Sequence, residues 1–230
     1  EVGGVSSCVD NLNNVYIAGN TGSSNGIAFN GFQNSLIGTA GAFIVKFNPA
    51  GVRQWGTYFG TVGTQVRGMC YDPTGNIYLT GNSLNSGASS HNLTYNGHQT
   101  TFGGGAYDAF LVKFSTSGSR IWATYYGDTG KDFSYSCTAD ANGSIYIAGN
   151  TSSTTNISYN GHQNIIGGLG SFAPMLTERG ESFLVKFDKD GVRQWATYYG
   201  DTSAVDIAMS CSVDKNNDIY LAGGTESSRY

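Results

Sequence analysis

The stretch "DAFLVKFSTSGSRIWATYYG" at residues 108–127 decides the fold, because most of it occurs three times in the chain. Its counterparts are "AFIVKFNPAGVRQWGTYFG" at 42–60 and "SFLVKFDKDGVRQWATYYG" at 182–200. In "FIVKF" the side chains alternate between two faces, as in a β-strand. The turn segments "NPAG", "STSG" and "DKDG" each end in a glycine that suits a positive φ. Each copy is therefore predicted to be two antiparallel strands joined by a tight turn.

A second motif occurs four times, and in each copy an Asp precedes a Gly by nine positions. Its copies are "DNLNNVYIAG" (10–19), "DPTGNIYLTG" (72–81), "DANGSIYIAG" (140–149) and "DKNNDIYLAG" (214–223). The β-branched and aromatic run before each Gly predicts a strand, and the turn-forming residues after each Asp predict a turn. The segment before each Asp is small and apolar, which is typical of a strand in a crowded place. Each repeat is thus expected to contain four strands.

The length of the repeat increases along the chain. Successive glycines of the second motif are 62, 68 and 74 residues apart, and most of the growth lies between the Gly and the next Phe. Without that segment, 38 to 40 residues remain per repeat. This is close to the roughly 40–45 residues of a four-stranded propeller blade. A constant framework therefore carries one loop of variable length.

These motifs resemble the bacterial β-propeller repeat known as the SBBP repeat, most closely at 72–81 and 108–127. The resemblance covers nearly the whole chain except parts of the variable loops. It implies an all-β propeller with four-stranded antiparallel blades, in a secreted or cell-surface bacterial protein. It also implies use as an interaction scaffold, and it carries no catalytic residues over to this chain.

The expected blades are residues 4–60, 64–127 and 132–200, followed by an incomplete blade at 206–230. We expect these blades to be a partial ring of a propeller with seven blades, within the range of about 4–8 blades that closed propellers use. The chain begins at "EVGGVSSCVD" without an initiator Met or signal peptide and also ends abruptly. We expect the third and fourth strands of the last blade to follow Tyr230, or another subunit to supply the remaining blades.

The resemblance places the first strand of each blade nearest the axis. The variable loops between the second and third strands then share one rim with the links between blades. These loops contain the phrase "YNGHQ" at 95–99 and 159–163, and "FNGFQ" at 29–33. Two histidines in matching contexts suggest metal or catalytic chemistry, but a metal site needs several converging ligands. Phe32 replaces the histidine in the first copy, which favours Asn-Gly turns and Gln-to-backbone hydrogen bonds that order the loop.

Contact with a ligand is the alternative role for these loops. The candidate ligand-binding residues lie in the loop phrases and in the links between blades: Phe32, Gln33, Tyr95, His98, Gln99, Tyr159, His162, Gln163, Asp132 and Asp206. No catalytic residue, metal ligand or cofactor is assigned. "DKNND" at 214–218 resembles a calcium loop but lacks the Gly and distal Glu of an EF-hand. Glu178, Arg179 and Glu181 are unique to one loop and are expected to solvate it.

Four further observations limit the function. The chain has 12% charged residues and a net charge of −4, so it offers no basic face for nucleic acid. No run approaches the roughly 18 apolar residues of a membrane helix. Lysines and arginines recur in every complete blade, which indicates strand-edge or inter-blade roles. The four cysteines occur one per repeat and are interpreted as buried thiols, although an even count in a secreted protein also permits disulfides.

Three functions remain open on the sequence alone. The first is a non-catalytic, extracellular scaffold that binds a protein or a glycan through the loop rim. The second is a structural spacer in a large adhesin or secretion-associated protein. The third is a propeller hydrolase or lyase, which is disfavoured because nearly every notable polar residue is repeated rather than unique.

Overall fold

The computed structural model describes residues 6–85, 93–167, 180–201 and 205–226, and all regular secondary structure in these ranges is β-strand. The first eight strands are β1 (Ser6–Val9), β2 (Val15–Thr21), β3 (Gly41–Phe47), β4 (Arg53–Phe59), β5 (Thr64–Tyr71), β6 (Ile77–Leu84), β7 (Tyr107–Phe114) and β8 (Arg120–Tyr126). The remaining strands are β9 (Asp132–Ala139), β10 (Ile145–Thr151), β11 (Glu181–Phe187), β12 (Arg193–Tyr199), β13 (Asp206–Val213) and β14 (Ile219–Thr225). The predicted all-β fold class is confirmed. The described part of the chain contains no helix long and apolar enough to span a membrane.

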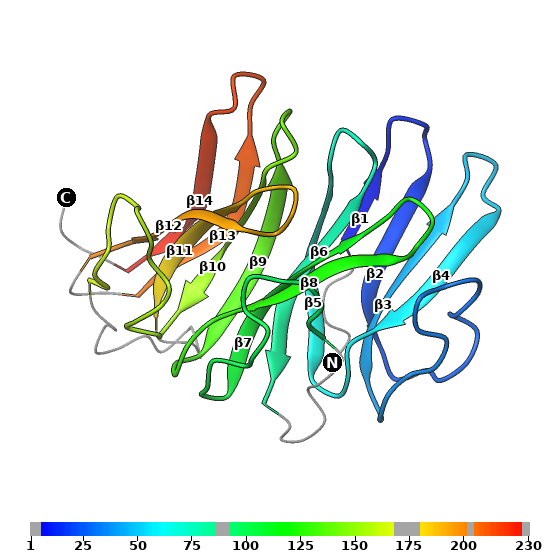
Figure 1. The fold of residues 1–230 in the computed structure, drawn as a ribbon, viewed down its shortest axis with the longest axis horizontal. Coiled ribbons are helices and arrows are strands. Elements are labelled where there is room, and N and C mark those ends of the chain that lie inside the picture. The colour runs from blue at the N-terminus through cyan, green and yellow to red at the C-terminus, as the bar shows by residue number, and fades with distance from the viewer. Residues whose placement is uncertain (1–5, 86–92, 168–179, 202–204, 227–230) are drawn as a thin grey trace.

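The strands form three four-stranded antiparallel sheets, β1–β4, β5–β8 and β9–β12, and one two-stranded sheet, β13–β14. Within each sheet the spatial order of the strands is their order in the chain. Figure 1 shows the sheets side by side, from β1–β4 in blue to β13–β14 in red. The first strands β1, β5, β9 and β13 contact one another from sheet to sheet. These sheets are the predicted blades, and a total of seven blades stays a prediction.

The hydrophobic core lies between neighbouring sheets. Phe59 of β4 packs against Phe110 and Phe114 of β7, with ring centroids 5.6 and 5.7 Å apart. One blade further, Tyr126 of β8 packs in the same way against Phe183 and Phe187 of β11. The repeated aromatic positions therefore bury the face of each sheet against the next one.

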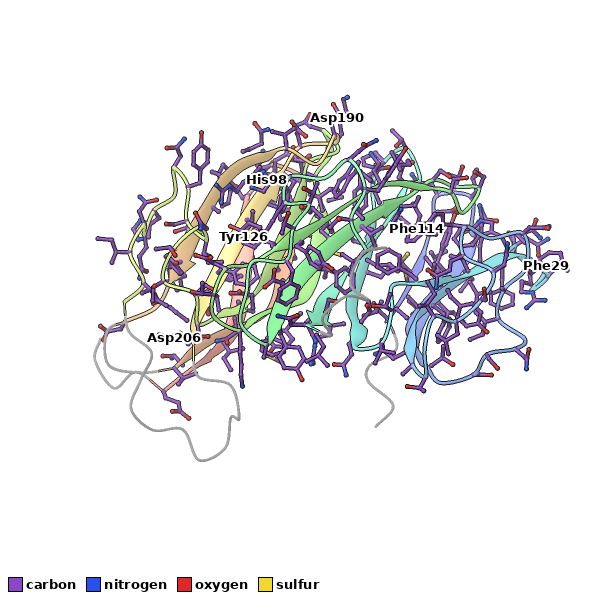
Figure 2. The ribbon with its side chains drawn as sticks, turned by 60° about the horizontal axis from the view of Figure 1, so that its bottom comes forward. Phe29, His98, Phe114, Tyr126, Asp190 and Asp206 are labelled. Atoms are coloured by element: carbon purple, nitrogen blue, oxygen red, sulfur yellow. The ribbon has the colours of Figure 1, made fainter. Side chains whose placement is uncertain are left out.

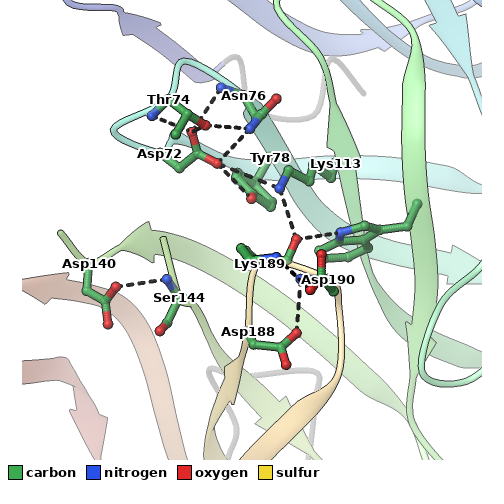
Figure 3. Close-up of polar contacts among 11 residues, drawn as sticks. Asp72, Thr74, Asn76, Tyr78, Lys113, Asp140, Ser144, Asp188, Lys189 and Asp190 are labelled. Atoms are coloured by element: carbon green, nitrogen blue, oxygen red, sulfur yellow. Dashed lines mark hydrogen bonds and ion pairs between the residues drawn. The ribbon is translucent and has the colours of Figure 1, made fainter. Parts of the chain in front are cut away.

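A polar network also joins the blades, on the side of the short turns (Figure 3). The carboxylate of Asp72 closes its turn by accepting hydrogen bonds from the backbone N–H of Asn76 at 3.0 Å and from the hydroxyl of Tyr78 at 3.0 Å. Lys113 lies 3.8 Å from Asp72 and donates a 2.9 Å hydrogen bond to the Lys189 carbonyl of the next blade. The same carbonyl accepts a hydrogen bond from the Trp122 indole at 3.1 Å. Lysine and tryptophan therefore link blades, which confirms the inter-blade role expected for Lys113.

The cysteines lie on the first strands of the blades, and all four thiols are free. Cys137 and Cys211 are buried, whereas Cys8 and Cys70 are half-buried. Burial raises the pKa of Cys8 and that of Cys211 to about 12. Such thiols remain protonated at neutral pH and behave as compact apolar side chains.

Candidate interaction surface

The variable loops are not confined to one rim of the propeller. Each loop returns along the outer strand of its own blade and pairs with it, at Phe29↔Gly56, Gln33↔Tyr58, Tyr95↔Ala123, Tyr159↔Ala196 and Gln163↔Tyr198. The predicted rim position of these motifs was therefore wrong. The reason is that an outer strand has an unpaired edge of N–H and C=O groups, and the loop backbone satisfies part of it.

The Asn-Gly pairs shape the loop at the point of contact. Asn30, Asn96 and Asn160 have φ values of 50°, 47° and 50°, in the left-handed region that Asn tolerates. The following glycine packs directly on the outer strand. A Cβ atom on Gly97 would lie 2.3 Å from the carbonyl oxygen of Ala123. Only glycine permits this close approach, so the Asn-Gly pair is a structural requirement of the loop.

The glutamine in each loop phrase holds the loop against its own blade through hydrogen bonds. The side-chain amide of Gln99 donates to the carbonyl of Thr101 at 3.0 Å, and its oxygen accepts from the backbone N–H of Gly127 at 3.2 Å. The backbone N–H of Gln99 also donates to the buried hydroxyl of Thr124 at 2.7 Å. Gln33 and Gln163 make equivalent bonds to the carbonyls of Ser35 and Ile165. The predicted hydrogen bonding of Gln to backbone is confirmed.

Exposed aromatic rings of the loops lie against arginines at the starts of the outer strands β4, β8 and β12. The guanidinium of Arg53 lies 5.0 Å from the ring centroid of Phe29, and that of Arg193 lies 4.9 Å from the ring of Tyr159. Arg120 lies between two rings, 4.5 Å from Phe32 and 5.2 Å from Tyr95. Because Phe32 belongs to the first blade and Tyr95 to the second, Arg120 connects the loops of two blades.

The two histidines occupy different surroundings. The imidazole of His98 packs edge-on against Phe187 of the next blade at 6.1 Å. Partial burial lowers the pKa of His98, and the nearby Arg193 guanidinium lowers it further. His162 is exposed. His98 therefore takes the place of Phe32 in a contact between blades.

Two acidic candidates lie elsewhere. Asp132 and Asp206 are buried at the starts of β9 and β13, and Figure 2 shows Asp206 well separated from His98. Asp132 accepts hydrogen bonds from Ser153 at 2.8 Å and from the backbone N–H of Asp128 at 3.0 Å. The sequence-predicted residues thus divide into exposed or half-buried side chains on the loops and buried carboxylates at the starts of β9 and β13.

The described residues contain no group of three or more His, Cys, Asp or Glu side chains arranged to hold a metal ion. In the "DKNND" segment, Asp214 accepts hydrogen bonds from the backbone N–H groups of Asn216 and Asp218 at 2.8 and 2.9 Å. This is the same turn that Asp72 closes in the second blade.

Some site residues were not predicted from the sequence. Arg120 was grouped with the blade framework, and its place between two loops depends on contacts across blades. Glu181 was expected to solvate a loop, but it is fully buried and accepts hydrogen bonds from the Gln163 amide and the Gly167 N–H. The sequence did contain a signal for this burial, because Glu181 aligns with Asp108 at the start of the third strand of its blade. Glu178 and Arg179 lie outside the described residues.

Blades of four antiparallel strands, stacked face to face about their first strands, define a β-propeller protein. Residues 54–87 and 121–157 match the SBBP beta-propeller repeat. These two matches confirm the SBBP repeat that the sequence motifs predicted.

Two further similarities were found. An uncharacterized WD repeat-containing protein of Acanthamoeba polyphaga mimivirus is 22% identical over 210 residues, which cover 83% of this chain and 15% of that protein. A gluconolactonase from Xanthomonas campestris superposes with a TM-score of 0.41 at 11% identity, over 95% of this chain and 53% of the enzyme. The chain thus spans a small part of the mimivirus protein and about half of the gluconolactonase.

Proposed function

We propose that this chain is a non-catalytic interaction scaffold of a secreted or cell-surface bacterial protein. Its binding surface is the outer face of the variable loops, and its partner is a protein or a glycan. The observation that supports this proposal is the repeated pairing of exposed aromatic rings with arginines. Aromatic and arginine side chains are enriched at interfaces, because they offer large rigid contact areas and several hydrogen-bond donors.

The exposure of these rings supports the same proposal. Phe29, Phe32, Tyr95 and Tyr159 are between 41 and 48% exposed, whereas the aromatic residues between the sheets are buried. The cation–π contacts between these rings and the arginine guanidinium groups are therefore accessible from solvent in each of the three blades. A partner with planar or sugar-like faces would find equivalent positions at regular intervals around the propeller.

A structural spacer is the second candidate, and one observation favours it. Each arginine also donates a hydrogen bond to its own loop, from Arg53 to Gly26 O at 2.8 Å, from Arg120 to Leu93 O at 3.0 Å and from Arg193 to Asn156 O at 2.9 Å. These bonds order the loop whether or not a partner binds. A binding scaffold should lose affinity for its partner when the rings are removed, whereas a spacer should not depend on them for binding.

The test is a screen of the purified chain against glycan and protein arrays, followed by titration of any hit. Replacing Tyr95 and Tyr159 together with Ala should weaken binding by about 5- to 150-fold, since each ring is expected to contribute roughly 0.5–1.5 kcal/mol. Leu12→Ala is the control, because Leu12 is an exposed apolar residue on the short turn between β1 and β2 and does not belong to these loops. Unchanged binding by a folded double variant would contradict the proposal, and a chain that binds nothing in either array would favour the spacer.

A further inference from the structure

Two buried carboxylates meet at the junction of the second and third blades. Asp108 of β7 and Asp132 of β9 are both fully buried. A Cβ atom on Gly127 would lie 2.6 Å from Asp132 Oδ2 and 2.8 Å from Asp108 Oδ1, so these two oxygens are no more than 5.4 Å apart. Gly127 thus provides the space in which the carboxylates approach each other.

The hydrogen bonds of the two groups are unequal. Asp132 accepts hydrogen bonds on both oxygens, from Thr151, from Ser153 and from the backbone N–H of Asp128. Asp108 Oδ2 accepts from the backbone N–H of Gly103 at 2.6 Å, whereas Asp108 Oδ1 is buried without a hydrogen-bond partner. A buried carboxylate oxygen without a donor is costly, and it is satisfied if it carries a proton toward a neighbouring oxygen.

The surrounding charges favour a proton. Burial, together with the neighbouring carboxylates of Asp132 and Asp128, raises the pKa of Asp108 to about 8, against the effect of the hydrogen bond from Gly103. Burial also raises the pKa of Asp132 to about 6, against the effect of its hydrogen bonds. Lys131, in the link between the two blades, is exposed. The groups that contact Asp108 from the loop, and those that contact Asp132 from the end of β10, are uncharged. The charge of Asp132 also contributes to raising the pKa of two nearby tyrosine hydroxyls, those of Tyr126 and Tyr198.

We propose that Asp108 and Asp132 share one proton near neutral pH, and that this proton holds the loop at 93–106 and the third blade together. Two like charges this close in a dry site do not both ionise. The shared proton comes from solvent when the chain folds. Because Asp108 Oδ2 also accepts from Gly103 and, at 3.4 Å, from Gln99, the state of the pair acts directly on the loop that carries Tyr95 and His98.

The other blades show how this site varies. In the first blade the equivalent positions are Gly41 and Thr64, and a Cβ on Gly60 would lie 2.4 Å from the Thr64 hydroxyl. In the third blade a Cβ on Gly200 would meet the Asp206 carboxylate at 2.5 Å and the Glu181 side chain at 2.7 Å. The position therefore holds a neutral pair in the first blade and acidic pairs in the other two, within one framework.

The sign of the pH effect follows from proton uptake. A folded-state pKa above the ordinary value means that the folded chain binds more protons than the unfolded chain at intermediate pH. This contribution to stability is fully present below the ordinary pKa of Asp, and it is lost as pH rises toward about 8. For one proton, the equilibrium constant for unfolding rises by at most about tenfold per pH unit across this window.

The experiment measures urea unfolding of the whole chain between pH 5 and pH 9. Asp108→Asn keeps the shape, and its amide can donate to Asp132 as the carboxyl O–H does. We expect this variant to be more stable than the wild type at pH 8 and to lose most of the pH dependence between pH 6 and pH 8. Asp190→Asn is the control, because Asp190 lies in an exposed ion pair with Lys189 and should leave the profile unchanged.

An infrared spectrum gives a second readout that does not depend on unfolding. The wild type should show the band of a protonated carboxyl group at pH 6.5, and Asp108→Asn should reduce its intensity by the share of one carboxyl group. The proposal is overturned if that band is missing from the wild type, or if Asp108→Asn retains the wild-type pH profile. Stabilisation by Ca²⁺ of the wild type at pH 8, but not of Asp108→Asn, would overturn it in favour of a bound cation.

Discussion

Replacing Gln99 with Ala tests whether the repeated loop phrase is structural. Three hydrogen bonds of the side chain are lost: to Thr101 O at 3.0 Å, to Asp108 Oδ2 at 3.4 Å and from the Gly127 N–H at 3.2 Å. A typical hydrogen bond contributes about 0.5–1.5 kcal/mol net, and the long bond to Asp108 contributes least. Gln99 is half-buried, so water replaces part of what is lost. We expect the variant to lose about 2 kcal/mol of unfolding free energy.

The assay is urea unfolding followed by tryptophan fluorescence, since each complete blade contains one Trp. A loss of this size lowers the thermal midpoint by about 4–8 °C for a chain of this length. His98→Phe is the matched comparison, because Phe32 already fills that position in the first blade and the ring contact with Phe187 can persist. We expect that variant to change stability by less than about 0.5 kcal/mol.

Two results would refute this reasoning. Gln99→Ala with wild-type stability would mean that the loop is held by its backbone pairing alone. A His98→Phe variant that is destabilised as much as Gln99→Ala would mean that the imidazole makes a contact that a phenyl ring does not replace.

Three other changes test the framework. Trp122→Phe keeps the ring but removes the hydrogen bond to Lys189 O, and should cost about 1 kcal/mol in urea unfolding, with an unchanged value counting against that link. Burial raises the pKa of Asp72, but hydrogen bonds led by Thr74 and Asn76 outweigh this and leave it below its ordinary value. The wild type should therefore lose stability as pH falls below about 4, and a stability profile of Asp72→Asn that matches the wild type from pH 7 to pH 3 would contradict this. Thiol titration without reductant should find about four free thiols after unfolding, whereas finding none would indicate disulfides.

The strands were predictable because their signals are local and repeated. "FLVKF" and "IYIAG" show the alternation and the aromatic or β-branched content of strands, and the turns between them carry the expected Gly and Asp. The hydrogen bonds of Gln99 were also predictable in kind, since Phe32 showed that the phrase works without a histidine. Repetition served as an internal control in both cases.

The course of the loops was not predictable from the sequence. Short pairings such as Tyr95↔Ala123 and single side-chain hydrogen bonds such as Arg120 to Leu93 O join a loop to its outer strand, and such contacts leave no periodic pattern. The contacts of Arg120 with Phe32 and Tyr95 join residues of two blades, so they depend on how blades stack. The meeting of Asp108 and Asp132 likewise depends on the path of the backbone at Gly127.

The residues that differ from blade to blade indicate where function can reside. Residues that are the same in every complete blade, such as the lysine and tryptophan represented by Lys113 and Trp122, are used to join one blade to the next. Such residues cannot distinguish one blade from another. The positions that differ between blades include the ring or imidazole at Phe32 and His98, and the acidic or neutral pair represented by Asp108. A partner that prefers one blade can contact the exposed ring or imidazole directly, whereas the buried pair can act on it only through the loop that the pair supports.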